Sequence, residues 1–400
     1  MDVENEPQIR VKFVTKFDKY RVPETPIAVP LRFSRYGLSE VVNHLLDLAT
    51  PQPFDFLING KFLRIVLSQF LAENDLSSEN VLSLEYIPII SKPEEKSSDS
   101  FPDWISSISV RDNYYTVGSY DGSLTLFNNN DEQLSKVRLH KLPIKSIASC
   151  VINNTLVGIT GSIDNRIKIV KAELNAEKPS FSVVNTLVGH NASLSTVSIS
   201  PNKKFFASGA WNGSLNVWNI ETQLNGTDKE KENPLNTFTG HNENISCISW
   251  IDNKSFLSSC WDHTIRSWDM ETEGVINTYL TNKVVTCVRY NPLNSLFISG
   301  HPDGIIRLFD SRASNGTIMK MAFSQSGSWT TSLAWKPDSE YIFVSGSQDH
   351  KIRLWDIRSS YPTYILDTIH TDKIFDVQWK DNNTILSGGA DKELKRSVIA

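Results

Sequence analysis

One repeated turn pattern constrains the fold of this 400-residue chain more than any other feature. Seven segments share a small residue, an Asp or Asn two positions later, and an alternating apolar run, as in SYDGSLTLF from Ser119. The turn residues are Asp121, Asp164, Asn212, Asp262, Asp303, Asp349 and Asp391, which lie 41 to 50 residues apart. That spacing is the period of a four-stranded propeller blade. A short side-chain acceptor between two strands stabilises a tight turn, so the pattern predicts a mainly β chain with seven blades.

A second signal keeps the same phase as the turns. Gly189-His190 and Gly240-His241 precede their turn residues by 22 and 21 positions, and His140 and His370 stand in similar places. The combined pattern resembles the WD-repeat family, whose fold is a closed ring of such blades. The resemblance therefore implies a seven-bladed WD-repeat β-propeller.

The same resemblance implies a hydrogen-bonded network of His, Ser or Thr, Asp and Trp inside each blade. The fullest match here is His241, Ser258, Asp262 and Trp268. A His, Ser and Asp set also fits the catalytic triad of a hydrolase. An active site occurs once, however, whereas this set recurs from blade to blade, so we expect a structural role and no catalytic residues.

The sequence ends just after the third predicted strand of the seventh blade. A blade without its outer strand would leave an open edge. We expect the segment between Ser91 and Pro102 to supply that strand. Because SKPEEKSSDS from Ser91 is polar and rich in charge, the same segment also reads as a linker over 91–102, between a domain at 7–90 and the propeller at 103–400.

The first ninety residues lack the repeated turn pattern and show a mixture of strand and helix patterns instead. Gln8–Phe13 and Ile27–Leu31 read as strands, and Leu38–Leu46 has helical spacing of apolar residues. Asn59-Gly60 is a strong hairpin signal between two further apolar runs. A short helical turn at Val66–Leu71 and a strand at Val81–Tyr86 follow. This order predicts a ubiquitin-like β-grasp domain of the α+β class.

Three blocks in this domain narrow the family. RYGLSEVVNHLL, PFDFLINGKFLR and LSSENVLSLEY resemble the Notchless-like ubiquitin-fold domain. With seven blades following it, the chain is similar to the Ytm-type WD-repeat subunit of the Pescadillo–Bop complex. The resemblance implies a non-enzymatic scaffold in large ribosomal subunit biogenesis and pre-rRNA maturation, on pre-ribosomal particles in the nucleus, nucleolus and nucleoplasm. Its propeller would bind a Bop-type WD-repeat protein alongside Pescadillo.

The resemblance also implies that the ubiquitin-like domain is the handle by which the AAA ATPase midasin removes the complex. The acidic residue that completes the midasin metal site in trans falls on Glu79, in LSSEN. A hard divalent cation prefers carboxylate oxygens, and the polar neighbours of Glu79 suit an exposed loop. From the residues alone Glu79 would be an ordinary surface charge, and Glu73 and Asp75 are local competitors. No metal or cofactor is expected within the isolated chain.

Residues directly before the turn Asp point toward the narrow face of a propeller. Three of them are large aromatics: Tyr120, Trp211 and Trp261. Exposed aromatic side chains grouped on one face suggest anchors for a protein partner. The alternative is that each ring covers its own blade or stacks on a neighbour.

Composition and motifs limit the other classes of function. A net charge of −5 argues against broad adhesion to nucleic acid. The four cysteines match no zinc or redox spacing, and we expect buried thiols. No signal peptide, membrane-spanning run, P-loop, Rossmann fingerprint or nucleophile elbow is found. The alternative function is a WD-repeat adaptor in the ubiquitin pathway. The final predicted strand runs on through Tyr86-Ile87-Pro88 into the linker, however, with no free Gly-Gly end for conjugation.

Overall fold

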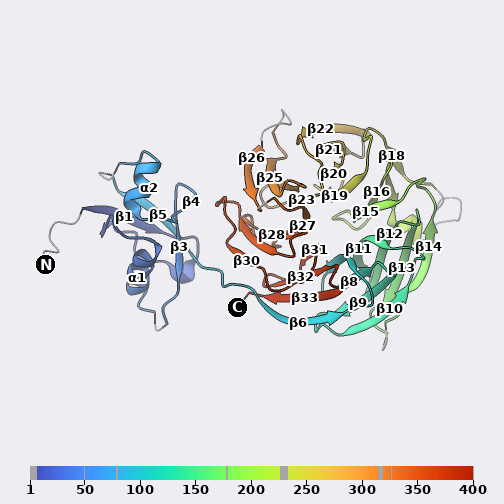
Figure 1. Ribbon diagram of the computed structural model, residues 1–400, viewed down its shortest axis with the longest axis horizontal. Coiled ribbons are helices and arrows are strands. Elements are labelled where there is room, and N and C mark those ends of the chain that lie inside the picture. The colour runs from blue at the N-terminus through green and yellow to red at the C-terminus, as the bar shows by residue number, and fades with distance from the viewer. Residues whose placement is uncertain are drawn as a thin grey trace. The chain divides into compact units, whose positions relative to one another are not determined.

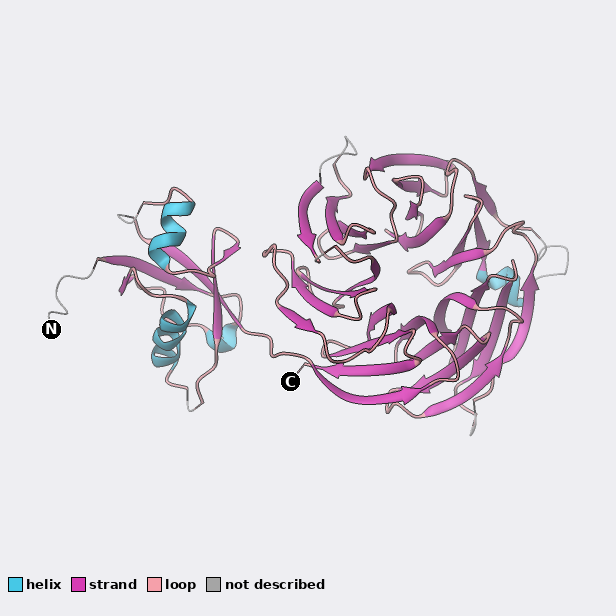
Figure 2. Ribbon diagram, viewed as in Figure 1, coloured by secondary structure: helices cyan, strands magenta, loops and turns pink. Residues whose placement is uncertain are grey.

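The computed structural model describes residues 7–48, 50–77, 80–176, 179–225, 233–313, 319–325 and 327–399. The chain divides into two compact units between Lys92 and Pro93. The first unit mixes helices and strands, and the second is built almost wholly of strands (Figure 2). No helix among the described residues is long and apolar enough to cross a membrane.

The first unit is a five-stranded sheet in the order β2-β1-β5-β3-β4. Its central strands β1 and β5 run parallel, and the other pairs are antiparallel. Along the chain the elements are β1 (Gln8–Val14), η2 (Asp18–Tyr20), β2 (Ile27–Pro30), α1 (Arg35–Leu46), β3 (Phe54–Ile58), β4 (Lys61–Phe62), α2 (Leu67–Glu73) and β5 (Leu82–Pro88). This is the predicted ubiquitin-like β-grasp.

The apolar residues of this unit form one core. Alternate residues of β1 point inward and pack against Leu38 and Val42 of α1 and against Phe70 of α2. Asn59 and Gly60 both have positive φ, 50° and 78°, as the tight turn between β3 and β4 requires. Sequence patterning placed α1 too late, at Leu38, because the polar first turn from Arg35 carries no apolar periodicity.

The second unit contains seven four-stranded sheets within the described residues, one for each turn residue in the repeat. The first blade comprises β7 (Ile105–Arg111), β8 (Tyr114–Ser119), β9 (Ser123–Asn128) and β10 (Gln133–Arg138), and the second comprises β11 (Ile144–Ile152), β12 (Thr155–Ser162), β13 (Ile167–Glu173) and β14 (Ser182–Leu187). The third blade comprises β15 (Leu194–Ile199), β16 (Phe205–Ala210), β17 (Leu215–Asn219) and β18 (Asn236–Phe238). The fourth comprises β19 (Ile245–Trp250), β20 (Ser255–Cys260), β21 (Thr264–Asp269) and β22 (Gly274–Leu280). A short helix, α3 (Ile220–Asn225), joins β17 to the connection before β18.

The last three blades comprise β23 (Cys287–Asn291), β24 (Leu296–Gly300), β25 (Ile305–Asp310) and β26 (Met319–Ser324); β27 (Thr330–Trp335), β28 (Ile342–Ser347), β29 (Ile352–Asp356) and β30 (Tyr364–Leu366); and β31 (Ile374–Trp379), β32 (Thr384–Gly389), β33 (Glu393–Val398) and β6 (Glu94–Ser100). The first strand of each blade contacts the first strand of the next, and β31 of the seventh contacts β7 of the first. The sheets therefore form the closed ring drawn in Figure 1.

The ring is closed by a strand from the opposite end of the unit. β6 pairs antiparallel with β33, with Glu393 opposite Ser100 and Val398 opposite Glu94. The segment 91–102 is therefore more than a linker, because most of it is the outer strand of the seventh blade. The polar composition of this segment suggested a linker. An outer strand is covered on one side only, however, and can therefore keep exposed charges.

Arg396 on β33 holds this closure together. Its buried guanidinium donates to the Tyr115 hydroxyl at 2.8 Å and to Ser97 of β6 at 3.3 Å, and it pairs with Asp131 at 3.0 Å. Asp99 of β6 is a further ion-pair partner. One buried cation thus joins β6, β33 and the first blade.

Candidate functional site

The fourth blade shows how the predicted network is built. His241 Nδ1 lies 2.8 Å from Asp262, and its Nε2 lies 2.7 Å from the Ser258 hydroxyl. The Trp268 indole N–H donates to the same hydroxyl at 2.7 Å. The structure therefore brings together all four residues. Burial alone would raise the pKa of Asp262, but hydrogen bonds from His241 and Thr264 outweigh that effect and lower its pKa below the usual range.

Two observations separate this network from a hydrolase triad. Ser258 has no exposed surface, so no substrate could reach its hydroxyl. The second blade repeats the arrangement with His140 at 2.9 Å from both Asp164 and Thr160. The seventh blade repeats it with His370 at 2.6 Å from Asp391 and 2.7 Å from Ser387. In these three blades the network ties the connection before the inner strand to the turn within the blade.

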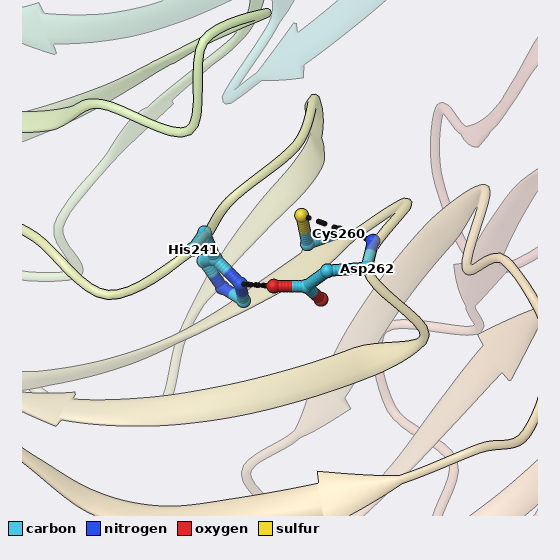
Figure 3. A group of neighbouring side chains, drawn as sticks. All are labelled: His241, Cys260 and Asp262. Carbon is cyan, nitrogen blue, oxygen red and sulfur yellow. Dashed lines mark hydrogen bonds and ion pairs between the residues drawn. The ribbon is translucent and has the colours of Figure 1, made fainter.

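His241, Cys260 and Asp262 also lie close enough together to be considered as metal ligands, as Figure 3 shows. Their ligand atoms already have partners, however. The Cys260 thiol faces the Glu243 carbonyl at 3.2 Å, and burial raises the pKa of Cys260 to about 12. A protonated thiol is a poor ligand, and both His241 nitrogens are engaged. We interpret the group as part of the blade network.

The end of the ring that carries the turns within the blades is called the narrow face here. In six of the seven blades a backbone hydrogen bond joins the residue before the turn to the connection that precedes the inner strand, as from Tyr120 N to Trp104 O at 2.9 Å and from Trp211 N to Ser193 O at 2.9 Å. The fifth blade has Pro302 at this position, which carries no N–H. Trp261 N bonds Asn244 O in the same way at 3.0 Å. These turns and connections therefore share one face.

Two of the three predicted aromatic residues project from this face. Trp211 and Trp261 are 50% and 42% exposed. Among the described residues, no ring contact or hydrogen bond involves either indole ring. Both side chains are therefore free to contact a partner.

Tyr120 behaves differently. Its ring packs against Trp104 and Phe375, with centroid distances of 5.3 and 5.8 Å, and its hydroxyl accepts a hydrogen bond from Lys145 at 2.9 Å. Tyr120 thus stacks on its neighbours, across the junction of the seventh and first blades. It contributes to the narrow face as part of an aromatic cluster.

The structure adds aromatic residues that the turn pattern missed. Trp104 and Trp329 are 41% and 44% exposed and lie in the connections before β7 and β27. The Trp329 carbonyl accepts a hydrogen bond from Gln348 N at 3.0 Å, which places it on the narrow face. These connections vary in length and carry no repeat signature, so only a search for large aromatics directly before each inner strand would have found them.

The repeat pattern did not reveal the residue that completes the network of the sixth blade, Gln325. Gln325 accepts a hydrogen bond from the Ser345 hydroxyl at 2.9 Å and donates to Thr330, in the place that His occupies elsewhere. Trp355 donates to the same Ser345 hydroxyl at 2.9 Å. Gln325 precedes Asp349 by 24 positions, as His140 precedes Asp164. An amide thus replaces the imidazole.

Glu79, the predicted ligand to the midasin metal, lies outside the described residues. It belongs to the connection between α2 and β5. Glu73 at the end of α2 and Asp75 just beyond it are both exposed. They are the nearest described carboxylates preceding Glu79.

The comparisons with known proteins cover both units. Residues 9–71 match the NLE (NUC135) domain, and residues 181–219, 232–269, 274–310 and 322–356 match the WD domain, G-beta repeat. The ribosome biogenesis protein WDR12 homolog of Chlamydomonas reinhardtii is 33% identical over 98% of this chain and 97% of its own length. The chain belongs to the WDR12 family of ribosome biogenesis proteins. The WDR12 homolog of Nematostella vectensis is 31% identical over 97% of this chain and 98% of its own length.

Membership of the WDR12 family confirms the predicted combination of a Notchless-like domain with WD repeats. The family model for WD repeats matches the third to sixth blades. The first, second and seventh blades have the same four-stranded order and complete the ring of this WDR12-family chain.

Proposed function

We propose that this chain is a non-enzymatic scaffold in large ribosomal subunit biogenesis and pre-rRNA maturation. In this proposal the propeller binds a Bop-type WD-repeat partner, with Pescadillo in the same complex, on pre-ribosomal particles. The ubiquitin-like unit is the handle by which the AAA ATPase midasin removes the complex. The chain works in the nucleus, in both nucleolus and nucleoplasm.

The observation that carries the proposal is the pairing of two modules in one chain of this family. A ubiquitin-like unit precedes a closed seven-bladed ring, and relatives named as ribosome biogenesis proteins align along almost the whole chain. The ring offers a broad rigid surface with exposed tryptophans. Its His, Ser and Asp sets are buried inside blades, which supports a binding role over a catalytic one.

Within the ubiquitin-like unit, the residue proposed to bind the midasin metal is Glu79. Magnesium binds through a small number of carboxylates and completes its octahedron from other sources, so a carboxylate from a second protein can fill an open position. Glu79 stands in the polar segment LSSEN between α2 and β5. A ligand supplied in trans makes binding depend on both the metal and one acidic side chain.

The test is a pull-down of midasin's adhesion domain with the full chain, in magnesium and in chelator. We expect wild type to bind only with magnesium and Glu79→Ala to lose binding at least roughly tenfold, as for loss of a charged ligand. Glu73→Ala and Asp75→Ala are matched controls, because both remove an exposed carboxylate from the same region.

Each outcome separates a different part of the proposal. If wild type does not bind in magnesium, the proposal that midasin grips the ubiquitin-like unit is overturned. Equal binding by Glu79→Ala and wild type would reject Glu79 alone, and a loss in Asp75→Ala or Glu73→Ala would reassign the ligand to that residue.

A further inference from the structure

The inner strands of the seven blades enclose a central channel with a cavity of about 690 Å³. Its charged lining is unbalanced among the described residues. Five basic side chains line it, namely Arg111, Lys145, Lys203, Arg289 and Lys336, against a single carboxylate, Asp376. The chain as a whole carries a net charge of −5, so this excess of positive charge is local to the channel.

Four of the five basic residues gather toward one mouth. Trp104 lies on the narrow face and directly precedes β7, so the inner strands run away from that face. Arg111 is the last residue of β7, and Lys336 directly follows β27. Lys203 comes after β15, and Arg289 is the middle residue of β23, two positions before its end. We call this opposite end of the channel the basic mouth.

The positive charges at the basic mouth are poorly neutralised. Arg289 donates to Cys247 Sγ at 2.7 Å and to the Val288 carbonyl at 3.1 Å, and Arg111 donates to the Val110 carbonyl at 3.1 Å. Lys336 lies over the Trp379 ring at 5.7 Å. Within the described part of the chain, no carboxylate lies within 4.0 Å of Arg111, Arg289 or Lys336. Lys203 has only Asp112, at 4.0 Å.

The one carboxylate in the channel is committed elsewhere. Asp376 accepts hydrogen bonds from the Ser332 hydroxyl at 2.6 Å and from the Ile108 backbone at 2.7 Å. Burial raises the pKa of Asp376, and the charge of Arg289 offsets only part of that effect. Asp376 favours the charged form of Arg289 against the effect of burial, but it is one carboxylate beside the five basic side chains of the lining.

Two basic side chains at the basic mouth, Arg111 and Lys336, have lowered pKa values. Arg111 is accessible to solvent, yet the surrounding wall disfavours its charged form, and the charge of Arg289 adds to that effect, so the pKa of Arg111 is lowered. Burial likewise lowers the pKa of Lys336. A bound anion would relieve both effects, because an opposite charge favours the protonated form.

We infer that the basic mouth binds a multivalent phosphate anion, with Arg111, Arg289 and Lys336 as its main ligands. Guanidinium groups match phosphate oxygens with paired hydrogen bonds, and an ammonium group adds a point charge. The channel as a whole encloses about 690 Å³, so its mouth can admit a small multivalent anion. Low-dielectric walls strengthen the attraction of a cleft lined by one sign of charge. This inference stands apart from the proposed function and can fail independently of it.

The experiment is a calorimetric titration of the full chain with inorganic tripolyphosphate at low ionic strength. We expect saturable binding that weakens roughly tenfold or more in Arg111→Gln and in Lys336→Gln, since each loses a charge-assisted contact. Lys171→Gln is the matched control, because it removes one exposed positive charge from β13 on a different part of the ring. The tryptophan fluorescence of each variant verifies that the propeller is folded.

A second titration, with a short single-stranded poly-uridine RNA, identifies the source of the phosphate. RNA binding that weakens in Arg111→Gln and Lys336→Gln would assign the site to a nucleic-acid backbone, and its salt dependence should fall with each lost charge. If the substitutions weaken tripolyphosphate binding but leave RNA binding unchanged, the site would be assigned to a free polyphosphate. The inference is overturned if neither probe binds saturably, or if Lys171→Gln weakens binding as much as the other variants.

Discussion

At the scale of single residues, the buried histidines divide into two groups. His140, His241 and His370 each face a carboxylate, whereas His190 and His301 bond only to neutral groups. His190 lies 2.7 Å from the Ser208 hydroxyl, and His301 lies 2.7 Å from the Ser299 hydroxyl. Without an anionic partner, burial lowers the pKa of both His190 and His301 to about 4. Both are neutral in the folded protein near pH 7.

This difference predicts how the free energy of unfolding depends on pH. An unfolded histidine titrates near pH 6.5, so between about pH 6.5 and 4 the unfolded state binds more protons than the folded state. The contribution of each histidine is fully present above pH 6.5 and is lost as the pH falls through that window. From pH 7 to pH 5 the loss should be about 2 kcal/mol for each.

Urea unfolding at the two pH values measures this effect. All ten tryptophans lie between residues 104 and 379, so their fluorescence reports the propeller alone. His301→Gln should lose about 2 kcal/mol less than wild type on acidification. The control is His263→Asn, which replaces an exposed histidine in the turn of the fourth blade and should match wild type. An unchanged pH dependence in His301→Gln would show that His301 does not titrate as its burial requires.

At the scale of secondary structure, β6 is the element on which the ring depends. It pairs with β33 along its length and supplies Ser97 and Asp99 to the buried Arg396. The boundary between the two units falls just before it, at Lys92. The first unit can therefore be removed with or without this strand.

Two truncations separate the roles of the unit and the strand. A chain lacking residues 1–92 should keep the urea midpoint of the propeller, because β6 remains. A chain lacking residues 1–100 should be destabilised by at least about 3 kcal/mol and should aggregate, since it leaves Arg396 without two partners and β33 as an open edge. Tryptophan fluorescence and gel filtration measure both effects. Equal midpoints for the two truncations would contradict the closing role of β6.

Seven blades could be counted from seven turn residues, because an Asp or Asn between two alternating strands leaves a local and periodic signature. For β6, the sequence indicated only the segment expected to supply the outer strand of the seventh blade, because its polar residues do not distinguish an outer strand from a linker. Trp104 and Phe375 are brought to Tyr120 by ring closure between the seventh and first blades, and such contacts leave no trace in local spacing.

At the scale of the whole propeller, exposed tryptophans are spread over one face. Trp104, Trp211, Trp261 and Trp329 come from the turns or connections of the first, third, fourth and sixth blades. Tryptophan is enriched among the residues that dominate binding energy in protein interfaces. A partner that covers several blades could engage more than one of these side chains at once.

This arrangement predicts the effect of removing single indole rings. Trp211→Ala and Trp261→Ala should each weaken binding of the proposed Bop-type partner by roughly 2 kcal/mol or more while leaving the urea midpoint near that of wild type. Tyr361→Ala is the control, because Tyr361 is a 75% exposed aromatic in the connection between β29 and β30. Surface plasmon resonance with the purified partner provides the measurement. Unchanged affinity in both tryptophan variants would move the docking surface away from the narrow face.

The position of β6 also sets an order of events during synthesis. Its ion-pair partner across the closure is far away along the chain: Glu95 and Lys395 are 300 residues apart and lie 3.0 Å from each other. During translation β6 emerges before the other propeller strands and has no partner until β33 of the final blade leaves the ribosome. The ubiquitin-like unit and the intermediate blades can form in that interval, whereas the closing contact must wait and carries the entropic cost of a very long loop. Closure of the propeller is therefore a late step, which cannot occur before β33 has been synthesised.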